Sequence, residues 1–335
     1  VAGQLNVNEE IIDYPQKVTM LNAIKISGRT KNGLGVGFFN AITGKTEATI
    51  KDNLTGNTRK VETNPFSNYN ILVLDKQFNQ NSSVTLINTN VTRVGDFRDA
   101  NVTGLLWHVE SKDSKYNIDG SVKMSNIFDD VNQPNTGYTF DTSFGRNAGN
   151  WSWEVGYNFE DENFNPNDMG ILFSNNERQI YGSAGYRTLK PKGNFNRINL
   201  NFFNYFQYQH HTGEYTGYQA NFNLNAETKN RLSFGSNLSY ATKTKDFNEP
   251  RKGNTSGVHF LRPERFSANA WISTNRQKKF STNLRMGFSN YMNDPKSSFD
   301  FGINPSYRIN NQFSLQYDII YYQTKNDIGY VNQAG

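Results

Sequence analysis

Apolar and polar side chains alternate along three consecutive stretches of the chain between residues 195 and 242. In the first stretch, 197–208, the even positions are mostly aliphatic or aromatic and the odd positions are mostly amides. The stretches 218–226 and 231–240 keep the same parity. A period of two is typical of extended strands, whose side chains point alternately to two faces. The pattern therefore predicts three long β-strands joined by short breaks.

The two faces of these strands differ strongly in chemistry. One is aromatic and aliphatic, and the other consists almost entirely of amides, serine and glycine with few charges. Strands that face lipid on one side and a polar lumen on the other have this pattern. From these strands alone, a soluble antiparallel meander with one solvated face stays open. The candidate lumen-lining residues are Arg197, Asn199, Asn201, Gln219, Asn221, Asn223 and Asn225.

The same alternation recurs along the chain and predicts about 16 strands, most of them roughly 9–14 residues long. Strands of globular proteins usually have about 5–6 residues, whereas a tilted membrane-spanning strand needs about 9–11. The length therefore favours a transmembrane antiparallel up-and-down β-barrel. The predicted strands are residues 17–28, 33–43, 67–76, 82–93, 99–110, 116–125, 137–146, 151–159, 179–187, 195–208, 215–226, 231–242, 265–274, 280–290, 297–308 and 313–324.

Short and long connections alternate between these strands. Every odd-numbered link is short, and most even-numbered links are longer. Outer-membrane barrels segregate short periplasmic turns and long external loops in this way. Because such barrels have an even number of strands, this parity predicts at least about 18 strands in the complete protein, with residues missing at both ends. The long links are 44–66, 127–136, 160–177 and 243–262, and the two short exceptions are 94–98 and 209–214.

Composition supports a barrel and excludes two other classes. Hydrophobic residues make up 35% of the 335 residues, and no apolar run approaches the length of about 18 residues that a spanning helix needs. Aromatic residues reach 14%, which argues against disorder and suits aromatic girdles. The net charge of +5 comes from scattered basic residues rather than one basic face, so nucleic acid is not an expected partner. There are no cysteines for disulfides or thiolate metal sites. We expect an N-terminal loop at 1–16 and the barrel at 17–335.

Four segments in the first third of the chain resemble a known family. They are residues 25–44, 68–75, 81–93 and 98–107. They are similar to a Bacteroidota family of large envelope proteins known as a domain of unknown function. The resemblance implies a C-terminal outer-membrane barrel, preceded by a small domain like a family 9 carbohydrate-binding module. It is close over 17–125 and looser beyond, and it brings no catalytic or ligand residues.

Residues with catalytic or metal-binding chemistry form no recognised motif. His210 and His211 are adjacent, and neighbouring side chains of an extended chain point apart, so one metal ion rarely takes both. The loop 160–168 is rich in oxygen ligands, but its spacing differs from a helix–loop–helix calcium site. The carboxylates Glu154 and Asp141 are the only basis for a hydrolase hypothesis. We expect no enzyme activity, no metal and no cofactor.

The function predicted from these patterns is a conduit or scaffold in the bacterial outer membrane, with a glycan-related role as a further hypothesis. The expected partners are the lipid bilayer and lipopolysaccharide, together with other envelope proteins or glycans. The alternative is a soluble all-β carbohydrate-binding module in which Trp151, Trp153 and Trp271 stack on sugar rings. For these tryptophans, the barrel hypothesis instead predicts an interfacial aromatic belt.

Overall fold

The computed structural model describes residues 2–129 and 133–327 of the chain. In this part of the chain the elements are 22 β-strands and one short 3-10 turn, Ala2–Gln4. The same residues contain no helix long and apolar enough to cross a membrane. Residues 130–132 of the predicted connection at 127–136, and 328–335 of the predicted tail, lie outside the described residues.

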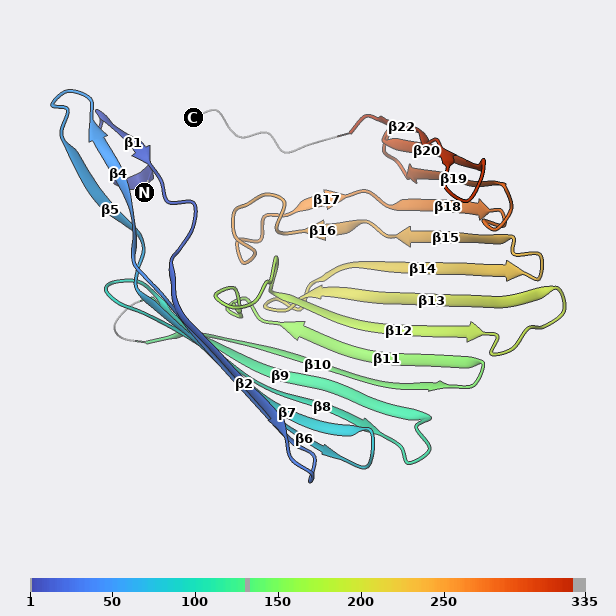
Figure 1. The fold of residues 1–335 in the computed structure, drawn as a ribbon, viewed down its shortest axis with the longest axis horizontal. Helices are drawn as coiled ribbons and strands as arrows, with labels where there is room; N and C mark the ends of the chain where they lie inside the picture. The colour runs from blue at the N-terminus through green and yellow to red at the C-terminus, as the bar shows by residue number, and fades with distance from the viewer. Residues whose placement is uncertain (1, 130–132, 328–335) are drawn as a thin grey trace. The chain divides into compact units, whose positions relative to one another are not determined.

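Most strands belong to one antiparallel sheet in which each strand pairs with the next strand of the sheet along the chain, except that β21 and β22 both pair with β20. The fold class predicted from the sequence, all-β and up-and-down, is confirmed. Figure 1 labels most of these strands. The strands of this sheet are β2 (Met20–Arg29), β3 (Leu34–Thr43), β6 (Ser67–Phe78), β7 (Ser82–Arg93), β8 (Asp99–Glu110), β9 (Tyr116–Phe128), β10 (Asn135–Ala148), β11 (Trp151–Glu160), β12 (Glu177–Arg187), β13 (Phe195–Gln209), β14 (Tyr215–Thr228), β15 (Ser233–Ala241), β18 (Arg265–Ser273), β19 (Phe280–Tyr291), β20 (Ser297–Arg308), β21 (Ser314–Gln316) and β22 (Ile319–Lys325).

Each of the sixteen predicted strands overlaps a strand of this sheet. The first fifteen have 9 to 15 residues, about twice the usual length of a globular strand. The last prediction, 313–324, is divided into β21 and β22, which both pair with β20. Alternation was a reliable signal because each strand has one apolar and one polar face, which fixes the register of a strand.

The chain divides into two compact units, which are described separately below. The first unit comprises Val1–Val109, Asp119–Phe140 and Asn163–Asn175. The second comprises Glu110–Ile118, Asp141–Glu162 and Asn176–Gly335.

Two segments outside the predicted strands contain strands of the first unit. The N-terminal loop at 1–16 includes β1 (Glu9–Asp13), and the connection at 44–66 forms the hairpin of β4 (Thr46–Asp52) and β5 (Thr58–Asn64). Together they make a separate three-stranded sheet, β1-β4-β5, labelled in Figure 1. Alternate residues of β4, including Ala48 and Ile50, are buried, while the charged residues between them made the segment look like a solvated loop.

An ion pair fastens β1 to β5. Both carboxylate oxygens of Glu9 accept hydrogen bonds from Arg59, with Nε to Oε1 at 2.7 Å and Nη2 to Oε2 at 2.7 Å. These bonds, with a further one from the backbone N–H of Asn6, lower the pKa of Glu9 to about 2. The ion pair that joins β1 to β5 therefore requires an ionised Glu9.

The connection at 243–262 also contains a short hairpin, in the second unit. Its strands are β16 (Thr244–Asp246) and β17 (Phe260–Arg262), which pair over three residues each. This connection was expected to be a long polar loop. Three-residue strands show too little alternation to be recognised from sequence.

Candidate functional site

The seven candidate lumen-lining residues lie on one face of β13 and β14, in the second unit. Asn199 is opposite Asn225, and Asn201 is opposite Asn223. The remaining three keep the same parity, because side chains two residues apart on a strand share a face. The structure thus brings together all seven residues that the sequence singled out.

A row of asparagines extends this polar face across four strands. Asn201 on β13 is opposite Asn223 on β14, which is opposite Asn237 on β15, which is opposite Asn269 on β18. The amide Nδ2 of Asn237 donates a hydrogen bond to Oδ1 of Asn223 at 2.8 Å. Sequence reasoning did not include Asn269 among the candidates. Asn269 lies two residues before Trp271 in an alternating strand. This position could have identified Asn269 as part of the polar face.

A row of hydroxyl groups runs parallel to the asparagine row. Asn221 on β14 is opposite Ser239, which is opposite Ser267, which is opposite Ser289 on β19. The Oγ atoms of Ser267 and Ser289 are 2.7 Å apart and form a hydrogen bond. These two rows of the polar face therefore offer both donors and acceptors without a charged side chain.

The opposite face of the same strands is apolar and exposed. Phe202 on β13 is opposite Phe222 on β14, and their exposed fractions are 39% and 37%. Leu238, Met286 and Phe288 on the neighbouring strands are exposed as well. In the described residues, no second sheet covers these side chains. A second sheet packed on them would have contradicted a membrane barrel. The aromatic face is in contact with the surroundings of the protein.

The tryptophans of the alternative hypothesis do not share a face. Trp153 is opposite Ala184, which is opposite Phe202, so Trp153 belongs to the apolar face. Trp151, two residues away on β11, lies on the same face, and its ring is 4.9 Å from that of Tyr186. Trp271 is opposite Gly235, which is opposite Asn225, and so lies on the polar face.

Two glycines accommodate a pair of large side chains on the polar face. Trp271 on β18 and Arg285 on β19 are directly opposite each other. A Cβ atom on Gly235 would lie 2.6 Å from Nε1 of Trp271, and one on Gly302 would lie 2.6 Å from Nε of Arg285. The indole and the guanidinium group thus extend over glycines on opposite sides of the pair. Larger residues at these two positions would displace them.

A cavity of about 350 Å³ opens beside Trp271, close to the short turns at 228–232 and 274–279. A neighbouring cavity of about 280 Å³ shares Arg276 and Asn283 with it and reaches Arg285. Among the residues that the structure describes, no carboxylate forms an ion pair with Arg231, Arg276 or Arg285. The residues that line the first cavity include Glu227, Arg231, Trp271, Arg276, Gln277 and Asn283.

In the first unit, part of the connection between β11 and β12 folds against the sheet. Phe164 is buried, and a Cβ on Gly137 of β10 would lie 2.1 Å from its backbone nitrogen. The backbone N–H of Asn165 donates to Oγ of Ser125 on β9 at 3.0 Å. These contacts hold residues 163–165 close to β9 and β10.

Two arginines fix the same connection further along. Asp168 Oδ1 is 2.7 Å from Arg93 Nη2, and Oδ2 is 3.0 Å from Arg98 Nη2. The Asp168 side chain is only 6% exposed and that of Arg93 15%. A carboxylate this well buried is stable only with its charge compensated. The loop that is rich in oxygen ligands is therefore attached to the end of β7 through Asp168.

The histidine pair has two different sets of partners in the second unit. The His210 ring stacks on Phe159 with 4.5 Å between ring centroids, whereas His211 Nδ1 is 2.9 Å from Oε1 of Glu162. A hydrogen bond from its own backbone N–H, assisted by His211, lowers the pKa of Glu162. Within the described ranges, no group of three or more metal-binding side chains is gathered.

One asparagine joins three connections at this end of the second unit. Asn176 is buried, its backbone N–H donates to the carbonyl of Asp161, and its Oδ1 accepts from the backbone N–H of His211. Its Nδ2 donates to the carbonyl of Asn254, which also accepts from Nε2 of Gln209. The long connections are therefore ordered by side-chain to backbone hydrogen bonds.

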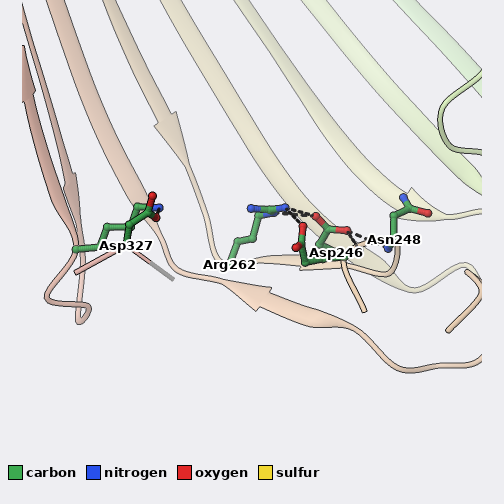
Figure 2. Close-up of polar contacts among 6 residues, drawn as sticks. Asp246, Asn248, Arg262 and Asp327 are labelled. Carbon is green, nitrogen blue, oxygen red and sulfur yellow. Dashed lines mark hydrogen bonds and ion pairs between the residues drawn. The ribbon is translucent and has the colours of Figure 1, made fainter. Parts of the chain in front are cut away.

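A charged cluster orders the β16–β17 hairpin, as Figure 2 shows. Oδ2 of Asp246 accepts from Nε and Nη2 of Arg262 at 2.8 and 2.6 Å, and its Oδ1 accepts from the backbone N–H groups of Asn248 and Glu249. Burial raises the pKa of Asp246, but the hydrogen bonds from Glu249, Arg262 and Asn248 outweigh it, and the net pKa is lowered. Asp327, also labelled in the figure, pairs with Lys296.

The strand order and the two unlike faces define an all-β protein with an antiparallel up-and-down sheet. The chain belongs to the family described as "Domain of unknown function (DUF5916)", which matches residues 1–335. The match to a family of unknown function thus covers the whole chain. No curated protein matches it.

Three solved structures are similar to this chain at low sequence identity. Pseudomonas aeruginosa OccK10 (OpdN) has 10% identity and a TM-score of 0.48, with 91% of this chain and 87% of that chain covered. Acinetobacter baumannii OccAB4 has 8% identity and a TM-score of 0.43, with 91% and 92% covered. Pseudomonas aeruginosa OccK11 (OpdR) has 8% identity and a TM-score of 0.39, with 90% and 88% covered.

Proposed function

We propose that this chain is a β-barrel of the bacterial outer membrane that acts as a conduit across it. The observation that carries the proposal is the contrast between adjacent residues of paired strands. Phe202 and Phe222 are opposite each other and exposed, while Asn201 and Asn223 are opposite each other on the other face. Lipid on the first face and water on the second satisfy both sets of side chains.

Water is a poor solvent for the apolar face of the second unit. Leaving one large apolar side chain in water rather than burying it forgoes about 1.5–3 kcal/mol. Exposed apolar patches beyond a few hundred Å² therefore mark contact with protein or membrane. On β13 the apolar parity, interrupted by Asn204, runs from Ile198 to Tyr208, which at about 3.4 Å per residue covers about 34 Å along the strand. A strand tilt of about 40° reduces this to about 26 Å across the membrane. The outward apolar band of an outer-membrane barrel is about 25 Å tall, so the lipid bilayer and lipopolysaccharide are the proposed partners.

The amide and hydroxyl rows support a conduit for hydrophilic solutes. Side-chain amides both donate and accept hydrogen bonds, as sugar hydroxyls do. The asparagine row from Asn201 to Asn269 therefore favours hydroxyl-rich cargo. The resemblance to Bacteroidota envelope proteins with a carbohydrate-binding-module-like domain supports the same glycan-related role. Binding of other envelope proteins or glycans, with the barrel as a scaffold, is the second version of this proposal.

Solute flux tests the conduit. The full-length protein is reconstituted into liposomes, and swelling is followed in isotonic solutions of sugars of increasing size. Swelling that falls off with sugar size is the expected result. Inserted protein without flux and without glycan binding would leave the scaffold version alone. Protein that stays dissolved and monomeric without detergent would overturn the membrane placement.

The soluble carbohydrate-binding module is less well supported by the tryptophan positions. A sugar platform needs its aromatic rings on one surface, but Trp151 and Trp153 share the apolar face and Trp271 lies on the polar one. Extraction separates the two functions, because a soluble module needs no detergent. We also propose that the chain is not an enzyme, since the hydrolase hypothesis rests on Glu154 and Asp141 without a defined site. A glycosidase assay on the purified protein tests this.

A further inference from the structure

We propose that the cavity beside Trp271 binds a carboxylate-bearing sugar, with Arg276 and Arg285 taking the carboxylate and the indole taking the ring. The site lies on the polar face of the second unit. The inference deepens the proposed conduit by naming a class of solute that it would hold. Binding can be measured without transport, so the two proposals are tested separately.

The backbone makes room for a ligand at this point of the sheet. Gly235 and Gly302 flank the opposed pair Trp271 and Arg285, and a Cβ atom on either glycine would lie 2.6 Å from the neighbouring large side chain. The indole and the guanidinium group are thus spread along the face instead of projecting side by side. A cavity of about 350 Å³ beside them lies within the size range of small-molecule sites.

Positive charge gathers in the two adjoining cavities. Arg231 and Arg276 line the first, and Arg276 and Arg285 line the second. Each cavity has one carboxylate, Glu227 in the first and Asp318 in the second, and Glu227 already accepts from Nδ2 of Asn196 at 3.2 Å. The three guanidinium groups form no ion pair with the described residues. Their planar donor forks fit a carboxylate with two parallel hydrogen bonds.

The remaining lining fits a sugar ring. Trp271 offers an apolar surface next to the charges, and aromatic rings of this kind pack on apolar faces while their N–H finds a polar partner. Gln277 and Asn283 add amide donors and acceptors for hydroxyl groups. A uronic acid combines the ring, the hydroxyl groups and the carboxylate in one small molecule. Neutral sugars lack the charge, and simple carboxylates lack the ring.

Titration calorimetry of the full chain in detergent micelles tests the site with glucuronate, glucose and acetate as probes. Glucuronate is expected to bind about tenfold more tightly than glucose or acetate. Glucose lacks the charge-assisted contact of the carboxylate, and acetate lacks the contact between the sugar ring and the indole. Arg285→Gln is expected to weaken glucuronate binding about tenfold, and Trp271→Ala to weaken glucuronate but not acetate. Arg265→Gln is the matched control: it removes the same charge from β18, six residues from Trp271, and is expected to leave binding within about twofold.

Equal affinity for glucuronate and glucose would overturn the proposal, and so would unchanged binding in Arg285→Gln. If Arg285→Gln does not fold, Arg276→Gln on the exposed turn replaces it, with the same expected loss. Circular dichroism and heat-modified mobility confirm that each variant is folded. Liposome swelling with neutral sugars reports separately on the conduit. Flux without glucuronate binding would contradict the proposed site and leave the conduit. Glucuronate binding without flux would contradict the conduit and leave the site.

Discussion

The indole nitrogen of Trp271 occupies the position that a side chain at residue 235 would need. A Cβ atom on Gly235 would lie 2.6 Å from Nε1 of Trp271 and 2.7 Å from the backbone oxygen of Leu224. Gly235 does not have a positive φ, so the neighbouring indole and the backbone oxygen of Leu224, rather than the backbone conformation, require a glycine here. The same relation holds between Gly302 and Arg285 on the other side of the pair.

Gly235→Ala is therefore expected to displace Trp271. Overpacking of this kind costs about 1–3 kcal/mol, because backbone or side chains must shift. Urea unfolding of the refolded protein in detergent measures the change, and the calorimetric affinity for glucuronate is expected to fall in parallel. Gly28→Ala is the control, since a Cβ atom there would meet nothing within 4 Å. An equal loss of stability in both variants would contradict a specific role for the indole.

The two faces of β14 predict losses of stability that differ in size for the same substitution at adjacent residues. Phe222→Lys places a charge on the exposed apolar face, where lysine near the bilayer midplane costs about 2–4 kcal/mol. Asn223→Lys places the same charge on the polar face and is expected to change stability by about 0.5 kcal/mol or less. Refolding into phospholipid vesicles at increasing urea concentration measures both. Similar losses at the two positions would contradict lipid on the Phe222 side.

Alternation of side chains was sufficient to predict β13 and β14 and the parity of their side chains, and so which residues share the polar face. It failed at β4, where charged residues such as Glu47 and Lys51 alternate with Ala48 and Ile50 and hide a buried strand. Turn residues such as Arg276 also escaped, since nothing in a local pattern shows that a turn approaches Arg285 on the next strand.

Long-range contacts set a further limit on prediction from the sequence. Asp168 is separated by 75 residues from Arg93. The local sequence of an oxygen-rich loop does not show whether its carboxylates are hydrated or paired with distant arginines. Trp271 lies opposite Gly235 only because β15 pairs with β18 in this register. The sequence indicated this pairing of strands only through the order of the turns.

The pairing of Asp168 with Arg93 and Arg98 predicts that one substitution releases residues 163–175 of the first unit. Asp168→Asn removes the charge that compensates Arg93, which is 15% exposed. Breaking a buried pair costs about 3–5 kcal/mol, and about 3 is expected here because Arg98 is largely exposed. Hydrogen exchange of 163–175 is expected to accelerate accordingly. Asp96→Asn, at an exposed position in the link before β8, removes the same charge and is expected to leave the exchange unchanged.

The Glu9 and Arg59 pair predicts a dependence on acid that is confined to the β1-β4-β5 sheet. Hydrogen bonds from Arg59 lower the pKa of Glu9 to about 2 in the folded sheet, against 4.5 for the ordinary side chain. Because the folded pKa is the lower one, the stabilisation is fully present above pH 4.5 and is lost as the pH falls toward 2. Protection of the β1 amides from hydrogen exchange, corrected for the intrinsic rate, is expected to decrease across this window.

Removal of the cation should abolish most of this pH dependence. In Arg59→Gln, Glu9 keeps only the backbone N–H of Asn6 as a strong partner, so protection of β1 is expected to be low already at pH 6 and to change little on acidification. Lys60→Gln is the matched control, because Lys60 is exposed and its nearest carboxylate is Glu47 at 3.5 Å. That variant should keep the acid transition of the unaltered chain. A transition of the same size in Arg59→Gln would show that another carboxylate, such as Glu47 with its own lowered pKa beside Lys45, governs the sheet.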